Sequence, residues 1–164
     1  MDTSALEIAC LMASANKCIE GVPGIAFVIV QKDQLDISNS TAHSYTLDLH
    51  SQWQALEANG QFRFTPPTQV LLALDKALDL LLEESVAGRY QRYQARQQEI
   101  QTGLTKLGFK ASVPAAMQAP IISSFDYPAD PHFDFEEFYE FLAQRGLIIY
   151  PGKMTERGTF RIGN

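Results

Sequence analysis

The chain has 164 residues, of which 46% are apolar and 20% are charged. This composition is ordinary for a globular protein with one or two small domains. The formal net charge is -6 at pH 7, which excludes a general electrostatic attraction to nucleic acid or anionic lipid. The apolar run at residues 70–84 is interrupted by Asp75, Lys76 and Asp79, and is shorter than the roughly 20 residues of a membrane span. The first residues lack the basic stretch of a signal peptide, so we expect a cytoplasmic protein that binds neither nucleic acid nor membrane.

Disulfide and metal chemistry are not indicated by the sequence. Cys10 and Cys18 are too few for a disulfide framework, and their spacing matches no zinc pattern. The three histidines, His43, His50 and His132, have no carboxylate or cysteine at the spacing of metal ligands. We therefore expect reduced cysteines and no metal site.

One lysine, Lys17, lies in a segment that contains glycine and proline, residues 14–24. The runs on either side, residues 6–13 and 25–30, are nearly all apolar, which predicts two strands buried on both faces of a parallel-type sheet. Lys17 is then expected to be partly buried at the edge of a core, where desolvation favours a neutral amine that can attack a carbonyl and form a Schiff base. The spacing alone also allows a turn lysine that points into water.

The middle of the chain is predicted to be mainly helical. Residues 33–40 are polar and typical of turns. Residues 46–58 carry apolar side chains at helical spacing, and Gly60 supplies a C-terminal stop. Residues 65–68 contain two prolines and begin a long apolar-faced helix, which Gly88 is expected to bend or interrupt.

The last third of the chain alternates strands and helices. The long helix is expected to end at Gly108, and Asp134 is expected to cap a shorter helix at residues 134–145. Strands are predicted at residues 120–125, 146–150 and 159–163. The sequence therefore predicts a small α/β domain at residues 68–164, whereas residues 1–67 hold too few elements to cover both faces of a sheet.

Several motifs resemble those of one enzyme family, the class V pyridoxal-phosphate-dependent aminotransferases, and within it the group that uses 2-aminoethylphosphonate and pyruvate. The resemblance extends over nearly the whole chain. Its motifs are SANKCIEGVPG (14–24), NGQFRFTPPT (59–68), QAPIISSF (118–125), FDFEEFYEFLAQRG (133–146), LIIYPGK (147–153) and FRIGN (160–164).

The resemblance implies part of a fold-type I, pyridoxal-phosphate-dependent transferase, an α/β fold. Residues 1–67 would be the last strands of the large cofactor-binding domain, with the lysine loop and an interface segment. Residues 68–164 would be the small C-terminal α/β domain, truncated at its end. The family's glycine-containing phosphate loop, its ring-stacking aromatic residue and its pyridine-pairing aspartate have no counterpart here. We therefore expect a fragment of a homodimeric enzyme that is inactive alone.

The resemblance also implies roles for three residues. Lys17 takes the position of the lysine that binds pyridoxal 5'-phosphate and moves a proton during the reaction. Arg161 takes the position whose guanidinium binds the acidic group of the substrate, and it alternates with apolar neighbours on a predicted strand. Thr65 resembles the residue that reaches the cofactor phosphate across the dimer interface, although it could equally cap the helix that begins near Pro66. Related enzymes have a tyrosine for this phosphate where the chain has Phe62.

The reaction implied by the resemblance moves an amino group from 2-aminoethylphosphonate to pyruvate, giving phosphonoacetaldehyde and L-alanine, in phosphonate degradation. Two alternatives stay open. The chain could be a non-catalytic α/β module that self-associates, or a class V aminotransferase with another amino donor such as alanine or serine.

The arginines of residues 89–96, which alternate with tyrosines, are expected to form a solvated helix face rather than a nucleic-acid surface.

Overall fold

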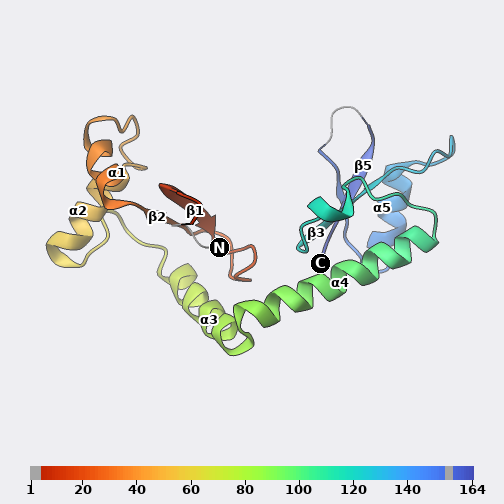
Figure 1. Cartoon of the computed structure of the whole chain (residues 1–164), viewed down its shortest axis with the longest axis horizontal. Coiled ribbons are helices and arrows are strands. Elements are labelled where there is room, and N and C mark those ends of the chain that lie inside the picture. The colour runs from red at the N-terminus through yellow and green to blue at the C-terminus, as the bar shows by residue number, and fades with distance from the viewer. Residues whose placement is uncertain (1–4, 154–156) are drawn as a thin grey trace. The chain divides into compact units, whose positions relative to one another are not determined.

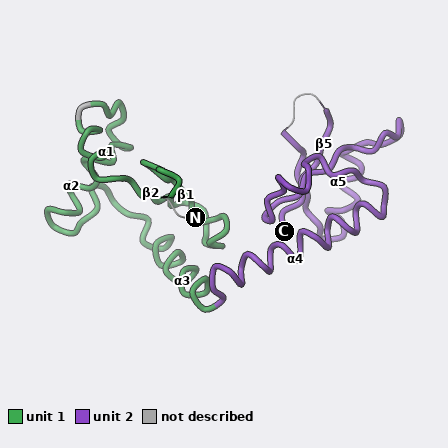
Figure 2. Tube along the Cα trace, in the orientation of Figure 1, with its two compact units in different colours: residues 1–83 green, residues 84–164 purple. Residues whose placement is uncertain are grey.

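The computed structural model describes residues 5–153 and 157–164. The chain divides into two compact units, residues 1–83 and residues 84–164 (Figure 2). Most helices and strands of both units are labelled in Figure 1. The sequence predicts a domain boundary at residue 68, at the start of the long helix, whereas the two units divide between residues 83 and 84.

The first unit contains a two-stranded antiparallel ribbon. Strand β1 (Cys10–Ser14) pairs with β2 (Ala26–Val30), with Cys10 opposite Val30 and Ser14 opposite Ala26. The predicted strands are present, but the expected parallel arrangement with two buried faces is wrong. Met12 is 75% exposed and Ile29 is 58% exposed. The sheet has only these two strands among the described residues, and so it leaves much of its apolar surface in solvent.

Three helical elements follow the ribbon. They are α1 (Lys32–Ile37), η1 (Ser38–Ser40) and α2 (Leu49–Asn59). The expectation of turns at residues 33–40 is wrong, because this polar stretch forms α1 and buries Leu35 as its apolar anchor. The stop predicted for α2 is confirmed, since Gly60 adopts the left-handed conformation at φ 72° and donates its N–H to the carbonyl of Leu56.

Two long helices meet at a single strained residue. Helix α3 (Thr68–Glu84) ends directly before Ser85, and α4 (Val86–Lys106) begins directly after it. The predicted interruption is present, but it lies three residues before Gly88. Ser85 has φ 68° and ψ 153°, and its Oγ accepts a hydrogen bond from the N–H of Gly88 at 3.0 Å. A serine cap therefore starts α4, with Gly88 in its first turn.

The second unit is a three-stranded antiparallel sheet covered on one face by helices. Its strand order is β3 (Ile122–Asp126), β5 (Thr159–Gly163), β4 (Tyr150–Pro151). The strand predicted at residues 146–150 is wrong except at Tyr150, where β4 begins, whereas β3 and β5 lie close to their predicted ranges. The remaining elements are η2 (Ala115–Met117) and α5 (Phe135–Ala143).

The core of this unit forms where α4 and α5 contact the sheet. Phe125, Ile149 and Phe160 are its buried centre, and apolar residues of both helices pack against them. The rings of Phe125 and Phe160, which face each other across β3 and β5, stack with centroids 5.7 Å apart. The predicted ends of both helices are confirmed, because Gly108 has φ 89° after α4 and the side chain of Asp134 accepts the N–H of Glu137 in α5.

Two features were not found among the described residues. No helix among them combines the length and the apolar character needed to cross a membrane. Within the same ranges, no group of three or more His, Cys, Asp and Glu side chains is placed to hold a metal ion.

Candidate functional site

The loop that carries Lys17 is closed by backbone hydrogen bonds. Ala15, which is fully buried, donates its N–H to the carbonyl of Ile25 at 3.2 Å and accepts the N–H of Gly21 at 2.8 Å. The carbonyl of Lys17 accepts the N–H of Glu20 at 2.8 Å. A Cβ at Gly21 would lie 3.0 Å from the Ala15 oxygen, so the close approach of the two backbones favours glycine there. The turn therefore fixes the backbone from which the lysine projects.

The side chain of Lys17 is exposed. The expected partial burial is wrong for this chain, because the loop extends beyond the paired ends of β1 and β2. Lys17 instead matches the alternative, a turn lysine whose side chain is exposed to water. Burial depends on neighbouring segments rather than on the local sequence, and so the apolar runs that flank the loop could not predict it.

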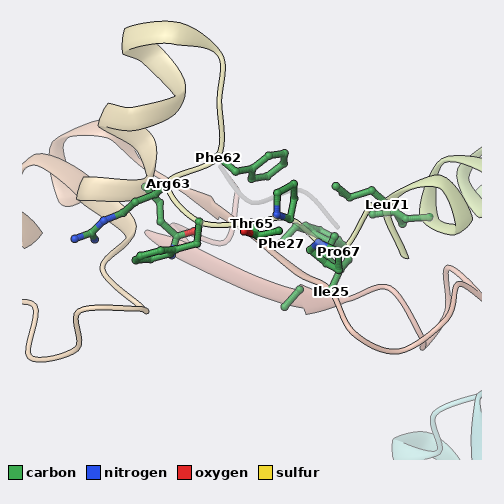
Figure 3. Close-up of a pocket in the computed structure, with 12 residues that line it drawn as sticks. Ile25, Phe27, Phe62, Arg63, Thr65, Pro67 and Leu71 are labelled. Carbon is green, nitrogen blue, oxygen red and sulfur yellow. The ribbon is translucent and has the colours of Figure 1, made fainter. Parts of the chain in front are cut away.

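Thr65 lies beside a cavity of about 370 Å³ in the first unit. Figure 3 shows it between Phe62, Pro67 and Leu71, with residues of β2 on the opposite side. The side chain of Thr65 is exposed. Its alternative role as a helix cap is wrong, because α3 begins only at Thr68. The lining is mainly apolar, and its polar members are Gln52, Arg63 and Thr65.

Arg63 is a feature of this site that sequence reasoning missed. Its guanidinium lies 4.4 Å from the ring centroid of Tyr45 and 5.1 Å from that of Phe64. It also pairs with Asp48, with 3.7 Å between Nη1 and Oδ2. The available signal was the sequence Phe62-Arg63-Phe64, in which an arginine between two aromatic residues favours stacking.

Arg161 lies on β5, the central strand of the second unit. Its cross-strand neighbours are Ser124 on β3 and Tyr150 on β4. The predicted alternation is confirmed, because Phe160 points into the core that α4 and α5 cover, whereas Arg161 lies on the other face. Its Nε donates to the carbonyl of Pro151 at 3.2 Å. Among the described residues, no hydrogen bond occupies its Nη1 and Nη2 atoms, and so these donors can meet an anion.

The three predicted site residues are divided between the two units. Lys17 and Thr65 belong to the first unit and Arg161 to the second. Within the first unit, Lys17 does not line the cavity beside Thr65.

The arginines of α4 differ from the expected solvated face. Arg89 is only 5% exposed, and its Nε donates to Glu84 at 2.7 Å. Arg92 donates to the same carboxylate from Nε at 2.6 Å and from Nη2 at 3.0 Å. These hydrogen bonds, first from Arg92 and then from Arg89, lower the pKa of Glu84 from 4.5 to about 2. The prediction of a solvated face is therefore wrong for Arg89 and Arg92, while Arg96 is exposed.

Comparison with known proteins gives matches along the entire chain. No model of a known protein family matches it. The 2-aminoethylphosphonate–pyruvate transaminase of Salmonella schwarzengrund (strain CVM19633) is 46% identical over 166 aligned residues, which cover 100% of this chain and 45% of the relative. Along its whole length the chain is therefore similar to part of a 2-aminoethylphosphonate–pyruvate transaminase. The transaminase of the same name from Salmonella gallinarum (strain 287/91 / NCTC 13346) matches with equal identity and coverage. The chain thus spans slightly less than half the length of these relatives.

Solved structures with low sequence identity share the fold of this chain. Pyridoxamine-pyruvate aminotransferase from Mesorhizobium loti superposes with a TM-score of 0.85 at 21% identity, covering 99% of this chain and 43% of that one. Alanine–glyoxylate aminotransferase from Nostoc sp. gives 0.84 at 16% identity, with coverages of 98% and 44%. Phosphoserine aminotransferase from Trichomonas vaginalis, solved with bound pyridoxal phosphate, gives 0.78 at 20% identity, with coverages of 99% and 44%. The expected fold-type I α/β architecture is confirmed.

Proposed function

We propose that this chain is part of a pyridoxal-phosphate-dependent aminotransferase that moves the amino group of 2-aminoethylphosphonate to pyruvate. The observation that carries the proposal is the 46% identity over all of this chain to relatives named for that reaction. In the proposal, residues 1–67 end the large domain and residues 68–164 form the small one. The intact protein would be a cytoplasmic homodimer.

The exposed groups of this chain fit pyridoxal phosphate at two points. The amine of Lys17 projects from a turn whose backbone is fixed by hydrogen bonds, so it is accessible to an aldehyde. The hydroxyl of Thr65 is exposed beside a cavity, where it can donate to a phosphate oxygen from another subunit. When bound, the cofactor supplies an aldehyde that takes up the amino group and a ring that withdraws electrons.

Lys17 has two roles in the proposed reaction. Its Nζ would hold pyridoxal phosphate through the aldehyde group of the cofactor. The same amine would act as the general base that accepts a proton from the amine-bearing carbon of the donor, and then as the general acid that gives the proton back. A lysine on a short closed turn suits both roles, because its backbone stays in place while its long side chain moves.

Arg161 would orient the substrates. Both 2-aminoethylphosphonate and pyruvate carry an anionic group, and a planar guanidinium can bind phosphonate or carboxylate oxygens through two parallel hydrogen bonds. The bond from Nε to the Pro151 carbonyl would fix the plane of the guanidinium and leave Nη1 and Nη2 for the anion. Placement on the central strand of the sheet further restrains its backbone.

A chimera tests this function. The chain would replace the matching 45% of the Salmonella schwarzengrund transaminase, and alanine formation from 2-aminoethylphosphonate and pyruvate would be measured. We expect activity in the chimera, its loss in Lys17→Ala, and its retention in Lys106→Ala, which removes an exposed lysine of α4. An active Lys17→Ala chimera would contradict the assigned role. Activity with alanine or serine but not with 2-aminoethylphosphonate would indicate another amino donor.

The exposed apolar surface of the ribbon favours a second candidate, a non-catalytic module that self-associates. Met12 and Ile29 expose large apolar side chains on neighbouring strands. Sedimentation of the chain and of a Met12→Lys variant would test this candidate. Association that disappears in the variant supports it, whereas a monomeric wild-type chain contradicts it.

A further inference from the structure

We infer that Arg63 is a positioning residue that holds Thr65 in the place from which its hydroxyl meets the cofactor phosphate. The inference rests on the proposed function, because it assumes the phosphate role of Thr65. It adds a residue that acts through Thr65 and does not itself contact the cofactor.

The segment that carries Thr65 lacks the hydrogen bonds of regular structure. It runs from the end of α2 to the start of α3 without forming a helix or a strand. Among the described residues, no backbone N–H from Gln61 to Thr65 donates to another backbone carbonyl, and Gln61 donates instead to the side chain of Asn59 at 2.9 Å. Pro66 and Pro67 have no N–H to donate. Side-chain contacts must therefore fix this segment.

Arg63 supplies such contacts. Its Nη1 donates to the carbonyl of Tyr45 at 3.0 Å. Its guanidinium lies beside the rings of Tyr45 and Phe64, and these two rings meet edge to face with centroids 5.7 Å apart. The side chain is 19% exposed, which is low for an arginine outside any helix or strand. A planar cation that packs beside both rings restrains the backbone of residues 63 and 64.

The partner of Arg63 is itself held by a helix. Asp48 pairs with Arg63 and is the N-cap of α2, where it accepts the N–H of Ser51 at 3.1 Å and the hydroxyl of the same residue. The contacts of Arg63 with Tyr45, Phe64 and Asp48, here called the clamp, therefore tie residues 61–65 to the start of α2. Asp48 lies 15 positions earlier in the sequence than Arg63. Figure 3 shows the guanidinium directed away from Thr65, Pro67 and Leu71. Arg63 is accordingly placed to act on the backbone of Thr65 rather than on a ligand.

The control for this clamp is a similar arginine in the other unit. Arg145 lies 3.5 Å from the ring centroid of Phe141 and donates to the carbonyl of that residue at 2.8 Å. Arg145→Met thus removes the same kinds of contact without touching residues 45–67. Arg63→Lys keeps the charge toward Asp48 but loses the planar fork.

Two nuclear magnetic resonance measurements on the purified chain test the inference. The first is the backbone order parameter at residues 63–65, which we expect near about 0.85 in the wild-type chain and in Arg145→Met, and below about 0.6 in Arg63→Met. Arg63→Lys should lie between them. Wild-type order parameters in Arg63→Met would overturn the inference.

The second measurement is the shift of the Thr65 amide resonance on titration with pyridoxal phosphate, for which weak binding is sufficient. We expect a saturable shift in the wild-type chain and in Arg145→Met, and an affinity reduced about tenfold in Arg63→Met, which corresponds to about 1.4 kcal/mol. Pyridoxal without phosphate should not distinguish the variants. An equal response in wild type and Arg63→Met would overturn the inference alone. A wild-type Thr65 that ignores pyridoxal phosphate would overturn the phosphate role of Thr65 and the inference with it.

Discussion

The Nε–H of Arg89 donates to the carboxylate of Glu84 at 2.7 Å, and Arg89 is nearly fully buried. This pair joins the last residue of α3 to the first turn of α4, and Arg92 completes it from the next turn. The carboxylate before Ser85 thus has two cationic partners, both of which follow Ser85 in α4. These contacts tie Glu84 to the first two turns of α4.

The ion pairs of Glu84 with Arg89 and Arg92 predict that the free energy of unfolding depends on pH. The pKa of Glu84 falls from 4.5 to about 2 on folding, because Arg92 and Arg89 donate to the ionised carboxylate. A lowered pKa in the folded state contributes stability that is fully present above about pH 4.5 and is lost as the pH falls toward 2. Glu84→Gln should therefore lower the free energy of unfolding at pH 7 and flatten its decline between these pH values.

Urea unfolding of the chain at a series of pH values measures this effect. Glu83→Gln is the matched control, because it removes the adjacent carboxylate, which is exposed. An unchanged pH profile in Glu84→Gln would show that the ion pairs do not contribute to stability.

Replacing Ser85 with glycine should stabilise the folded chain. The φ of 68° and ψ of 153° at Ser85 lie in a region that only glycine adopts without strain. Ser85→Gly relieves this strain at a cost of a few tenths of a kcal/mol for the lost cap, so we expect unfolding to require about 1 kcal/mol more. Ser85→Ala keeps the strain and loses the cap, and should cost about 1 kcal/mol. Thermal unfolding that ranks alanine above glycine would contradict this account.

The ring of Tyr127 leaves no room for a side chain at Gly158. A Cβ at this position would lie 2.6 Å from Cε2 of Tyr127, closer than real contacts allow. Gly158→Ala should therefore lower the free energy of unfolding by about 1–3 kcal/mol. At Gly103 a Cβ meets nothing within 4 Å, and so Gly103→Ala in α4 should raise it by up to about 1 kcal/mol. Equal effects of the two substitutions would contradict the packing described.

The isolated chain should bind pyridoxal phosphate only weakly. Lys17 is exposed and does not line the cavity beside Thr65, so the chain alone surrounds the cofactor poorly. Absorbance titration of the purified chain measures this, with Lys17→Ala as the control for labelling of other lysines. Tight binding that disappears in Lys17→Ala would show that the chain holds the cofactor without further segments.

Local signals in the sequence predicted the ends of helices well. Gly60, Gly108 and Asp134 act where they were expected, because capping depends on the conformation of a single residue and a few neighbouring backbone groups. The side chains of Arg161 and Phe160 lie on opposite faces of β5, as predicted, because successive side chains of a strand alternate between its two faces.

Properties set by distant segments were predicted poorly. The burial of Lys17 and of the ribbon strands depends on what covers them, which no local pattern contains. Arg89 is buried because it meets a carboxylate across a helix interruption, whereas its spacing alone predicted a solvated face. The clamp at Arg63 joins residues 45–48 to residues 63–64, and only the fold brings these together.

The assignment of Lys17 is tested most directly by finding where the cofactor attaches. The chimera with the Salmonella schwarzengrund transaminase would be loaded with pyridoxal phosphate, reduced with borohydride and digested, and the labelled lysine would be located by mass spectrometry. The account predicts a pyridoxyl group on Lys17 and unlabelled Lys32 and Lys106. A label on another lysine, with Lys17 unmodified, would contradict it.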